Sequence, residues 1–193
     1  MKFRTILLFG APGAGKGTQG KILGTIPNYF HCACGDVFRN LDRESEIGRI
    51  CAGYTSRGEL VPDDLTVRIW REFVEGSIRD GHFRPEQDTL VLDGIPRNPR
   101  QAEMLKDTIE VVAIIYLRST NPDNLIQRLQ SRALKEKRPD DANVDVIRHR
   151  LKTYEKETRP VLNCYGKPLV HRINADQTPA RVLFDILRRM VKI

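Results

Sequence analysis

Nine residues near the N-terminus have the composition of a phosphate-binding loop. Residues 10–18 read Gly-Ala-Pro-Gly-Ala-Gly-Lys-Gly-Thr and follow an apolar run at 6–9. Glycines let backbone N–H groups approach a phosphate closely, and a helix beginning near Gly15 would aim its positive end at the same anion. Lys16 can reach the outer phosphates as a point charge. The order of strand, glycine-rich turn and helix therefore predicts a phosphate-binding loop, in the variant that ends Gly-Lys-Gly-Thr.

Five arginines are candidates for holding phosphates. Phosphoryl transfer mainly needs a protein to position the reactants and to cancel negative charge, and arginine forks bind phosphate oxygens in a bidentate way. The candidates are Arg39, Arg97, Arg132, Arg138 and Arg150. A single arginine is most often a solvated surface charge, so it is the whole set that indicates a bound polyanion. Asp140 and Asp141 are expected to tether Arg132 or Arg138.

Asp93 is the candidate magnesium residue. It directly follows an apolar run at 89–92. A carboxylate at a strand end in a phosphate-binding fold can hold Mg²⁺, largely through water because this ion gives up its water reluctantly. A role as a helix cap or turn former is the alternative. Asp36 is a second candidate, although a capping role would already account for it.

Strands and helices are expected to alternate along the chain. Apolar runs predict strands over 3–9, from 29, and over 89–92, 111–117 and 169–173. Helical patterns are found at 15–26, 37–41, 63–81, 100–106, from 122, at 144–154 and from 179. This alternation predicts an α/β fold with a parallel sheet. Ligands of such folds bind at the carboxyl ends of the strands, so the loop at 10–18 and Asp93 should lie close together.

Several boundaries follow from particular residues. Asp36 and Asp63 are expected to cap the helices that follow them, and Pro27 is expected to stop the first helix. The segment 42–60 is polar and rich in glycine, which favours a small mobile subdomain. The almost entirely polar segment 131–143 predicts a short exposed lid.

The composition is typical of a soluble chain with one domain. The sequence has 193 residues, of which 40% are hydrophobic and 30% charged, enough for one core with small inserted lids. No apolar run approaches the ~20 residues of a membrane span, and cleavage of a signal peptide would destroy the first strand. None of the four cysteines forms a Cys-x-x-Cys pair, which excludes the usual zinc spacing and favours a reducing cytosol.

The net charge of +7 has two explanations. It fits either a nucleic acid partner or arginines gathered around a small polyanion. A nucleic acid partner would predict basic residues clustered with exposed aromatics. The aromatics fall mostly on apolar faces and the arginines at the phosphate motifs, so the small polyanion is favoured.

Several motifs, in the right order, resemble those of the adenylate kinases in their short-lid form. Residues 10–19 resemble their phosphate loop, and 58–63 resemble the motif that closes their monophosphate lid. Residues 92–97 (Leu-Asp-Gly-Ile-Pro-Arg) are similar to their Leu-Asp-Gly-Phe-Pro-Arg motif, and 138–141 resemble their Arg-x-Asp-Asp. The resemblance covers essentially the whole chain and implies one kinase domain with a P-loop NTPase fold. It implies a core of 1–30, 62–130 and 142–193, a monophosphate-binding lid over 31–61 and an ATP lid over 131–141.

The resemblance also implies a reaction and the residues that carry it. ATP and AMP would give two ADP reversibly, with Mg²⁺ held through water by Asp93, in a monomeric cytoplasmic enzyme. ATP would be bound by Gly13, Ala14, Gly15, Lys16, Gly17, Thr18, Arg132 and Gln177. AMP would be bound by Cys34, Arg39, Glu59, Leu60, Val61, Gly94, Ile95, Pro96, Arg97, Gln101, Arg138 and Arg150. The catalytic residues would be Lys16, Arg97, Arg132, Arg138 and Arg150.

Selectivity for the acceptor base depends on Gln101 and Cys34. Gln101 stands four residues after Arg97, where the family has the glutamine that reads the AMP base, and an amide suits an adenine edge. Relatives that act on uridine or cytidine monophosphate tend to carry asparagine in that region. Cys34 replaces the usual threonine and is a weaker hydrogen-bond partner. The alternatives are a pyrimidine or broad-specificity monophosphate kinase, or a nucleotide-binding sensor without transfer activity.

The thiol of Cys34 has two possible characters. The positive charge of Arg39 nearby would favour the thiolate and ready alkylation. An inert buried thiol is the alternative.

Overall fold

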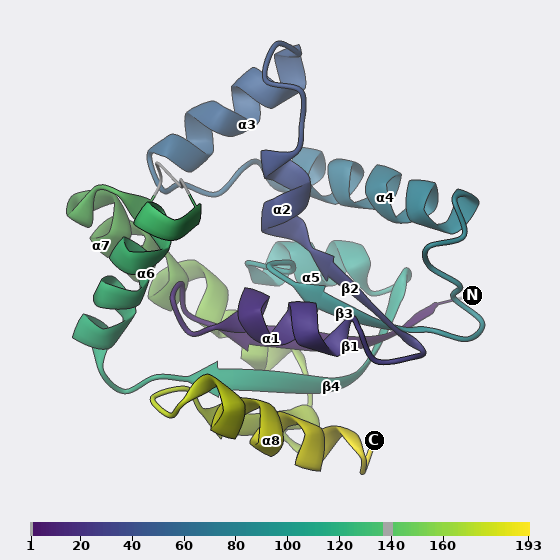
Figure 1. Ribbon diagram of the computed structural model, residues 1–193. Helices are drawn as coiled ribbons and strands as arrows, with labels where there is room; N and C mark the ends of the chain where they lie inside the picture. The colour runs from purple at the N-terminus through teal and green to yellow at the C-terminus, as the bar shows by residue number, and fades with distance from the viewer. Residues whose placement is uncertain (1, 137–140) are drawn as a thin grey trace.

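A five-stranded parallel sheet forms the centre of the structure (Figure 1). The computed structural model describes residues 2–136 and 141–193. The strands are β1 (Phe3–Gly10), β2 (Tyr29–Ala33), β3 (Thr89–Asp93), β4 (Ile109–Arg118) and β5 (Val170–Asn174). They lie in the order β2-β3-β1-β4-β5, and every neighbouring pair is parallel. The predicted α/β fold with a parallel sheet is confirmed.

Helices cover both faces of this sheet. They are α1 (Lys16–Leu23), α2 (Cys34–Arg39), α3 (Glu46–Ser56), α4 (Asp63–Arg79), α5 (Pro99–Leu105), α6 (Pro122–Glu136), α7 (Val144–Thr153) and α8 (Pro179–Met190). A π-helical turn over Tyr154–Thr158 continues α7, and short 3-10 helices follow at Arg159–Cys164 and Lys167–Leu169. No helix among the described residues is long and apolar enough to cross a membrane.

Side chains of β1 alternate between two cores. Leu7 and Phe9 pack in a cluster with Trp70 of α4 and Leu105 of α5. Ile6 and Leu8 pack in a second cluster that includes residues of α1 and α8. Because successive strand residues point to opposite faces, four consecutive buried residues place β1 between two helical layers. This explains why its sequence is continuously apolar.

The strand register brings the predicted phosphate site to one edge of the sheet. Leu8 of β1 stands beside Asp93 of β3, and Asp93 stands beside Ala33 of β2. The carboxyl ends of β1, β2 and β3 therefore lie together. The predicted loop 10–18 begins two residues beyond Leu8, so the expected closeness of this loop and Asp93 is confirmed.

Two groups of helices rise above this edge. Figure 1 shows α3 set off from the sheet at the top of the view, with α6 and α7 at the left. The segment after α3 approaches α7: a Cβ atom on Gly58, which has φ +73°, would lie only 2.8 Å from Cγ of Arg150. The position therefore requires glycine both for its backbone conformation and for this close approach.

Some predicted boundaries are wrong. The helices expected to start after Asp36 and Asp63 start earlier, with Ala33 and Pro62 at the capping positions. Both aspartates lie within the first turn, where a carboxylate still complements the helix dipole. The first helix ends at Leu23 rather than at Pro27. The exposed segment expected from 131 is helical as far as Glu136.

Packing between α1 and β2 gives a stability prediction. A Cβ atom on Gly20 would lie 2.2 Å from Nε2 of His31, whereas one on Gly76 of α4 would meet only Nη2 of Arg79 at 3.6 Å. We expect Gly20→Ala to lower the free energy of unfolding by about 1–3 kcal/mol. Gly76→Ala, the matched control, should raise it by about 0.5–1 kcal/mol through helix propensity. Urea unfolding of both variants measures the difference, and equal stabilisation by both would contradict the packing.

Candidate active site

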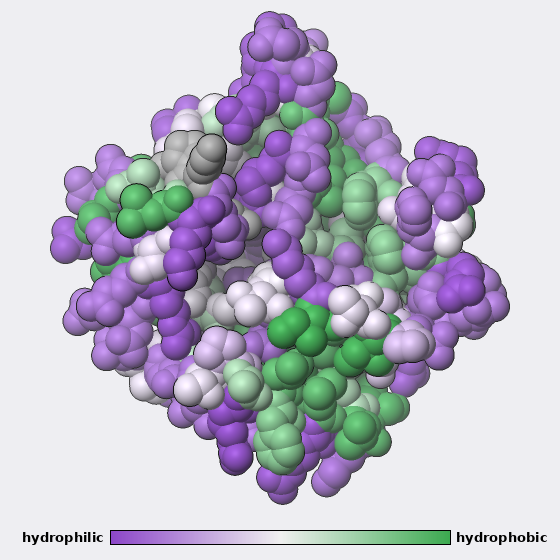
Figure 2. All heavy atoms as spheres, viewed as in Figure 1, coloured by the Kyte–Doolittle hydropathy of each residue, from purple (hydrophilic) through white to green (hydrophobic). Residues whose placement is uncertain are grey.

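A cavity of about 500 Å³ lies at the carboxyl edge of the sheet. Its wall is formed by the loop after β1, the α2–α3 segment, the end of β3, and residues of α6 and α7. Figure 2 shows a recess on this face, bordered mainly by hydrophilic side chains. The predicted residues on the wall are Gly13, Lys16, Gly17, Thr18, Arg39, Glu59, Leu60, Val61, Asp93, Gly94, Ile95, Pro96, Arg97, Gln101, Arg132 and Arg150.

The loop after β1 has the backbone of an anion site. Gly13 and Gly15 both have positive φ, at 83° and 96°. A Cβ atom on Gly13 would lie 2.8 Å from the carbonyl oxygen of Leu125. A Cβ atom on Gly15 would have no neighbouring atom within 4 Å among the described residues. Ala14 between them is buried in the second core. This apolar side chain helps to anchor the loop, and α1 begins two residues after Ala14, at Lys16.

Lys16 is a partly buried cation that is held by backbone carbonyls. Its Nζ donates to the carbonyl oxygens of Gly10 at 2.8 Å and Ala11 at 3.2 Å. Burial lowers the pKa of Lys16 to about 8, opposed by the nearby Asp93 carboxylate. The guanidinium groups of Arg97, Arg132 and Arg150 lower this pKa further. Four cationic side chains therefore face one another across the cavity, an arrangement that a polyanion would stabilise.

Asp93 supplies a carboxylate beside the loop. It is 8% exposed, and a Cβ atom on Gly17 would lie 4.0 Å from its Oδ2. Its carboxylate accepts no hydrogen bond from the described residues. Within residues 2–136 and 141–193, no group of three or more His, Cys, Asp and Glu side chains could hold a metal ion. A magnesium ion here would thus depend on one carboxylate together with water and phosphate oxygens.

A buried carboxylate, Asp141, joins two of the arginines. Asp141 is 0% exposed. Its Oδ2 accepts from Nε of Arg132 on α6, at 2.7 Å, and its Oδ1 accepts from Nη1 of Arg150 on α7. The expected tether of Arg132 is confirmed, and the same carboxylate also fixes Arg150. Arg138 and Asp140 lie outside the described residues.

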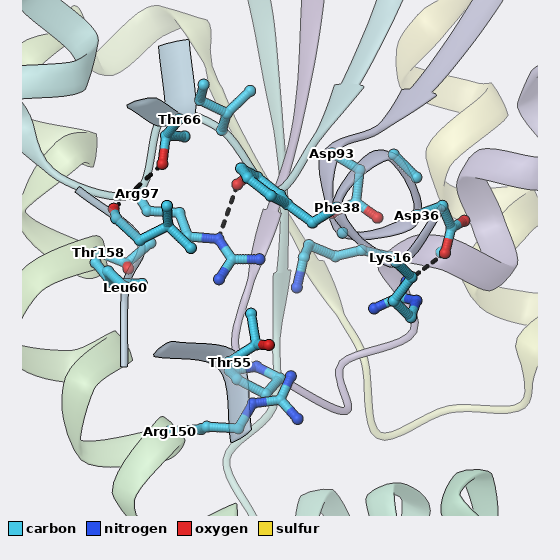
Figure 3. A pocket seen from close by; sticks show the side chains of 18 of the residues that line it. Lys16, Asp36, Phe38, Thr55, Leu60, Thr66, Asp93, Arg97, Arg150 and Thr158 are labelled. Carbon is cyan, nitrogen blue, oxygen red and sulfur yellow. Dashed lines mark hydrogen bonds and ion pairs between the residues drawn. The ribbon is translucent and has the colours of Figure 1, made fainter. Parts of the chain in front are cut away.

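Two further arginines reach the cavity from other elements. Nε of Arg97 donates to the carbonyl oxygen of Gly94 at 2.8 Å, and Arg39 forms an ion pair with Asp36. Figure 3 shows Arg97, Arg150 and Lys16 directed into the same space from the β3 end, α7 and the loop. Cations that are far apart in the sequence thus converge where the strand ends meet.

Apolar side chains also line the cavity. Leu60, Val61 and Ile95 lie on its wall, as does the amide side chain of Gln101. Oε1 of Gln101 accepts from the backbone N–H of Arg97 at 2.7 Å, and its Nε2 donates to Asp63 at 2.8 Å. Apolar walls around one oriented amide suit the flat face and polar edge of a base.

Cys34 is a buried thiol that does not lie on the cavity wall. It is 1% exposed and packs in the first core. Burial raises the pKa of Cys34 to about 12, which outweighs the lowering effect of Arg97 and Arg39. Of the two possible characters of Cys34, the thiolate is wrong, because the loss of hydration exceeds the attraction of the guanidinium groups. The inert buried thiol describes this residue.

Gln177 also lies away from the cavity wall. Its Nε2 donates to the carbonyl oxygen of Asn174 and to Oδ2 of Asp185.

Other residues on the cavity wall were not anticipated from the sequence. Phe38, Thr55 and Thr158 are among them (Figure 3). No motif marks them, because the folding of α2, α3 and the π-helical turn brings them to the cavity.

The loop, the strand-end carboxylate and the converging arginines define a P-loop site of the kind that binds nucleotide phosphates. The family model described as adenylate kinase matches residues 8–170. An adenylate kinase of Thermobifida fusca is 37% identical, over 88% of this chain and 89% of that protein. An adenylate kinase of Cyanothece is 39% identical over 83% and 80%. One of Flavobacterium psychrophilum is 35% identical over 97% and 96%. The chain belongs to the adenylate kinase family.

The position of Lys16 predicts how nucleotide binding depends on pH. Phosphates need the charged lysine, and they raise its pKa when they bind. We expect constant ATP affinity well below pH 8 and a fall approaching tenfold per pH unit above it. Binding at pH 8 should take up about half a proton. Calorimetry in buffers of different ionisation enthalpy measures both quantities.

The control for this prediction is Lys16→Arg, whose guanidinium stays charged throughout this range. Its ATP affinity should lack the decline above pH 8. A decline of the same size in this variant would assign the titration to another group.

Proposed function

We propose that this chain transfers the terminal phosphoryl group of ATP reversibly to AMP, forming two ADP and so balancing the adenine nucleotides. The observation that carries the proposal is the convergence of Lys16, Arg97, Arg132 and Arg150 on one cavity at the phosphate loop. A loose transition state spreads negative charge over the equatorial phosphoryl oxygens. Cations that are already in place stabilise this charge without reorganisation during the reaction.

The two nucleotides would approach from opposite sides. The loop from Gly13 to Thr18, together with Arg132, would hold the phosphates of ATP. Arg39, Arg97, Arg138 and Arg150 would hold the phosphate of AMP, whose base would lie between Leu60, Val61 and Gln101. This arrangement would set the acceptor phosphate in line with the bond to be broken, and such positioning accounts for much of the catalysis of phosphoryl transfer.

Mg²⁺ would be held by Asp93 through water. The mostly buried carboxylate beside Gly17 fits such a site. When bound, the ion neutralises charge on the donor phosphates. Lys16 would meanwhile exchange its two backbone carbonyl partners for phosphate oxygens. Because both partners are neutral, the exchange gains a charge-assisted interaction.

Two lids are expected to close over the reactants. Segments 31–61 and 131–141 would exclude water, which could otherwise accept the phosphoryl group in place of AMP. The close approach of Gly58 to Arg150 supports this role, since it links the first segment to α7.

The protein is further proposed to act as a cytoplasmic monomer without a nucleic acid or membrane partner. Its four cysteines are all free thiols, and three are buried, which suits a reducing compartment. Its cavity arginines account for part of the +7 charge without a nucleic acid partner. Size-exclusion chromatography with light scattering would test the monomer.

The acceptor is tested by coupled assays of ADP formation from Mg-ATP with AMP, UMP, CMP or GMP. We expect a strong preference for AMP. Preference for UMP or CMP would keep the mechanism but change the substrate. Binding of ATP without transfer to any acceptor would leave a nucleotide-binding sensor.

The phosphate loop predicts the effect of Lys16→Met. The loss of this cation should lower kcat/KM for Mg-ATP by at least about 100- to 1,000-fold, while thermal unfolding shows that the fold remains. Lys106→Met, which removes an exposed lysine paired with Glu103, is the matched control and should retain activity. Near-normal turnover by Lys16→Met would refute the mechanism.

A further inference from the structure

Asp63 connects the start of α4 to the residue expected to read the acceptor base. Its Oδ1 accepts from Nε2 of Gln101 at 2.8 Å and from Nδ2 of Asn98 at 2.7 Å. The Asp63 side chain is 15% exposed, and Gln101 is 1% exposed. Both donors come from the start of α5, where Asn98 caps the helix and Gln101 lies in the first turn. A single carboxylate oxygen thus holds the recognition amide against a second helix.

These partners allow only one orientation of the Gln101 amide. The backbone N–H of Arg97 donates to Oε1 of Gln101 at 2.7 Å, while Asp63 accepts from Nε2. A backbone N–H can only donate, and an ionised carboxylate can only accept. If the amide oxygen and nitrogen changed places, Oε1 would face the carboxylate of Asp63, an acceptor against an acceptor. Nε2 would face the backbone N–H of Arg97, a donor against a donor. In this buried position neither mismatch could be relieved by water.

The fixed amide keeps one acceptor site and one donor for a ligand. After the two internal bonds, Oε1 has a second lone pair and Nε2 has a second hydrogen. Adenine offers a donor at N6 and an acceptor at N1, whereas a 6-oxopurine offers an acceptor at O6 and a donor at N1. An amide that could rotate would match either base. An amide with a fixed orientation matches only one of them in a given pose.

We propose that Asp63 is a positioning residue that sets base selectivity: it holds the Gln101 amide in the orientation that accepts adenine and rejects a 6-oxopurine. This inference rests on the proposed function, in which AMP is the acceptor. Asp63 does not lie on the cavity wall, so it can affect the acceptor base only through Gln101. Its Oδ2 also lies 3.9 Å from Nε of Arg100. Its loss therefore changes the choice of acceptor base rather than the phosphate site.

The test compares Asp63→Asn with the neighbouring control Asp64→Asn. An asparagine amide can accept or donate, so this variant removes one of the two constraints on Gln101 and leaves only the backbone N–H of Arg97 to oppose the exchanged orientation. The Asp64 side chain is 76% exposed and pairs only with Arg100 among the described residues. Initial rates are measured with AMP and with IMP at saturating Mg-ATP, and KM for ATP is measured separately.

The expected result is a change of specificity. In Asp63→Asn, kcat/KM for IMP relative to AMP rises at least about tenfold, KM for AMP rises, and KM for ATP stays constant. Asp64→Asn keeps the wild-type ratio. Asn98→Ser, which removes the other donor to Asp63 but leaves Gln101 fixed, also keeps the ratio. If thermal unfolding shows that Asp63→Asn is unstable, Asp63→Ser is used, since its hydroxyl also accepts or donates.

Two results would overturn the inference and are distinguishable. In the first, the wild type prefers AMP, but the Asp63 variant loses activity equally with AMP and IMP. Asp63 would then have a structural role only. A wild type without preference for AMP would overturn the proposed function, and the role of Asp63 with it. Calorimetric binding of AMP and IMP without ATP separates base recognition from turnover in both cases.

Discussion

The repulsion among cations around Lys16 is the constraint on which the rest of the site depends. Burial and the three arginines Arg97, Arg132 and Arg150 all disfavour the charged lysine, and its pKa is lowered to about 8. The ligand-free protein tolerates this because the carbonyl oxygens of Gly10 and Ala11 solvate the ammonium group. A bound polyanion would relieve the repulsion. Part of the affinity for phosphates is therefore established by the fold before any ligand arrives.

Each site arginine that the structure describes is held by an acceptor of the protein itself. Asp141 fixes Arg132 and Arg150 from a fully buried position, and the carbonyl oxygen of Gly94 holds Arg97. Two arginines on one buried carboxylate keep a net positive charge while satisfying its oxygens, which limits the desolvation penalty. Guanidinium groups with several donors can keep these bonds and still direct others at a ligand. Preorganisation of the cations and their capacity to bind phosphate are thus compatible.

The site can be predicted from the sequence because its motif residues occupy strand ends. The glycine-rich loop and Asp93 each follow an apolar run, and parallel register brings such ends together. Predictions from local patterns were wrong where tertiary packing determines the role of a residue. Asp63 has the side chain of a helix cap, yet its carboxylate bonds to α5. The charge near Cys34 suggested a thiolate, but burial, which no motif reveals, determines its pKa.

The burial of Cys34 also clarifies which residue can select the base. The family's usual threonine is replaced here, which suggested a weakened contact with the base. The thiol instead packs in the core behind the cavity wall, beside Gly94: a Cβ atom there would lie 3.6 Å from the Cβ of Cys34. A side chain in this position contributes to packing more than to hydrogen bonding. In the proposed function, selection of the base would therefore fall to the oriented amide of Gln101, whose geometry is determined by the contact between two helices rather than by any single motif.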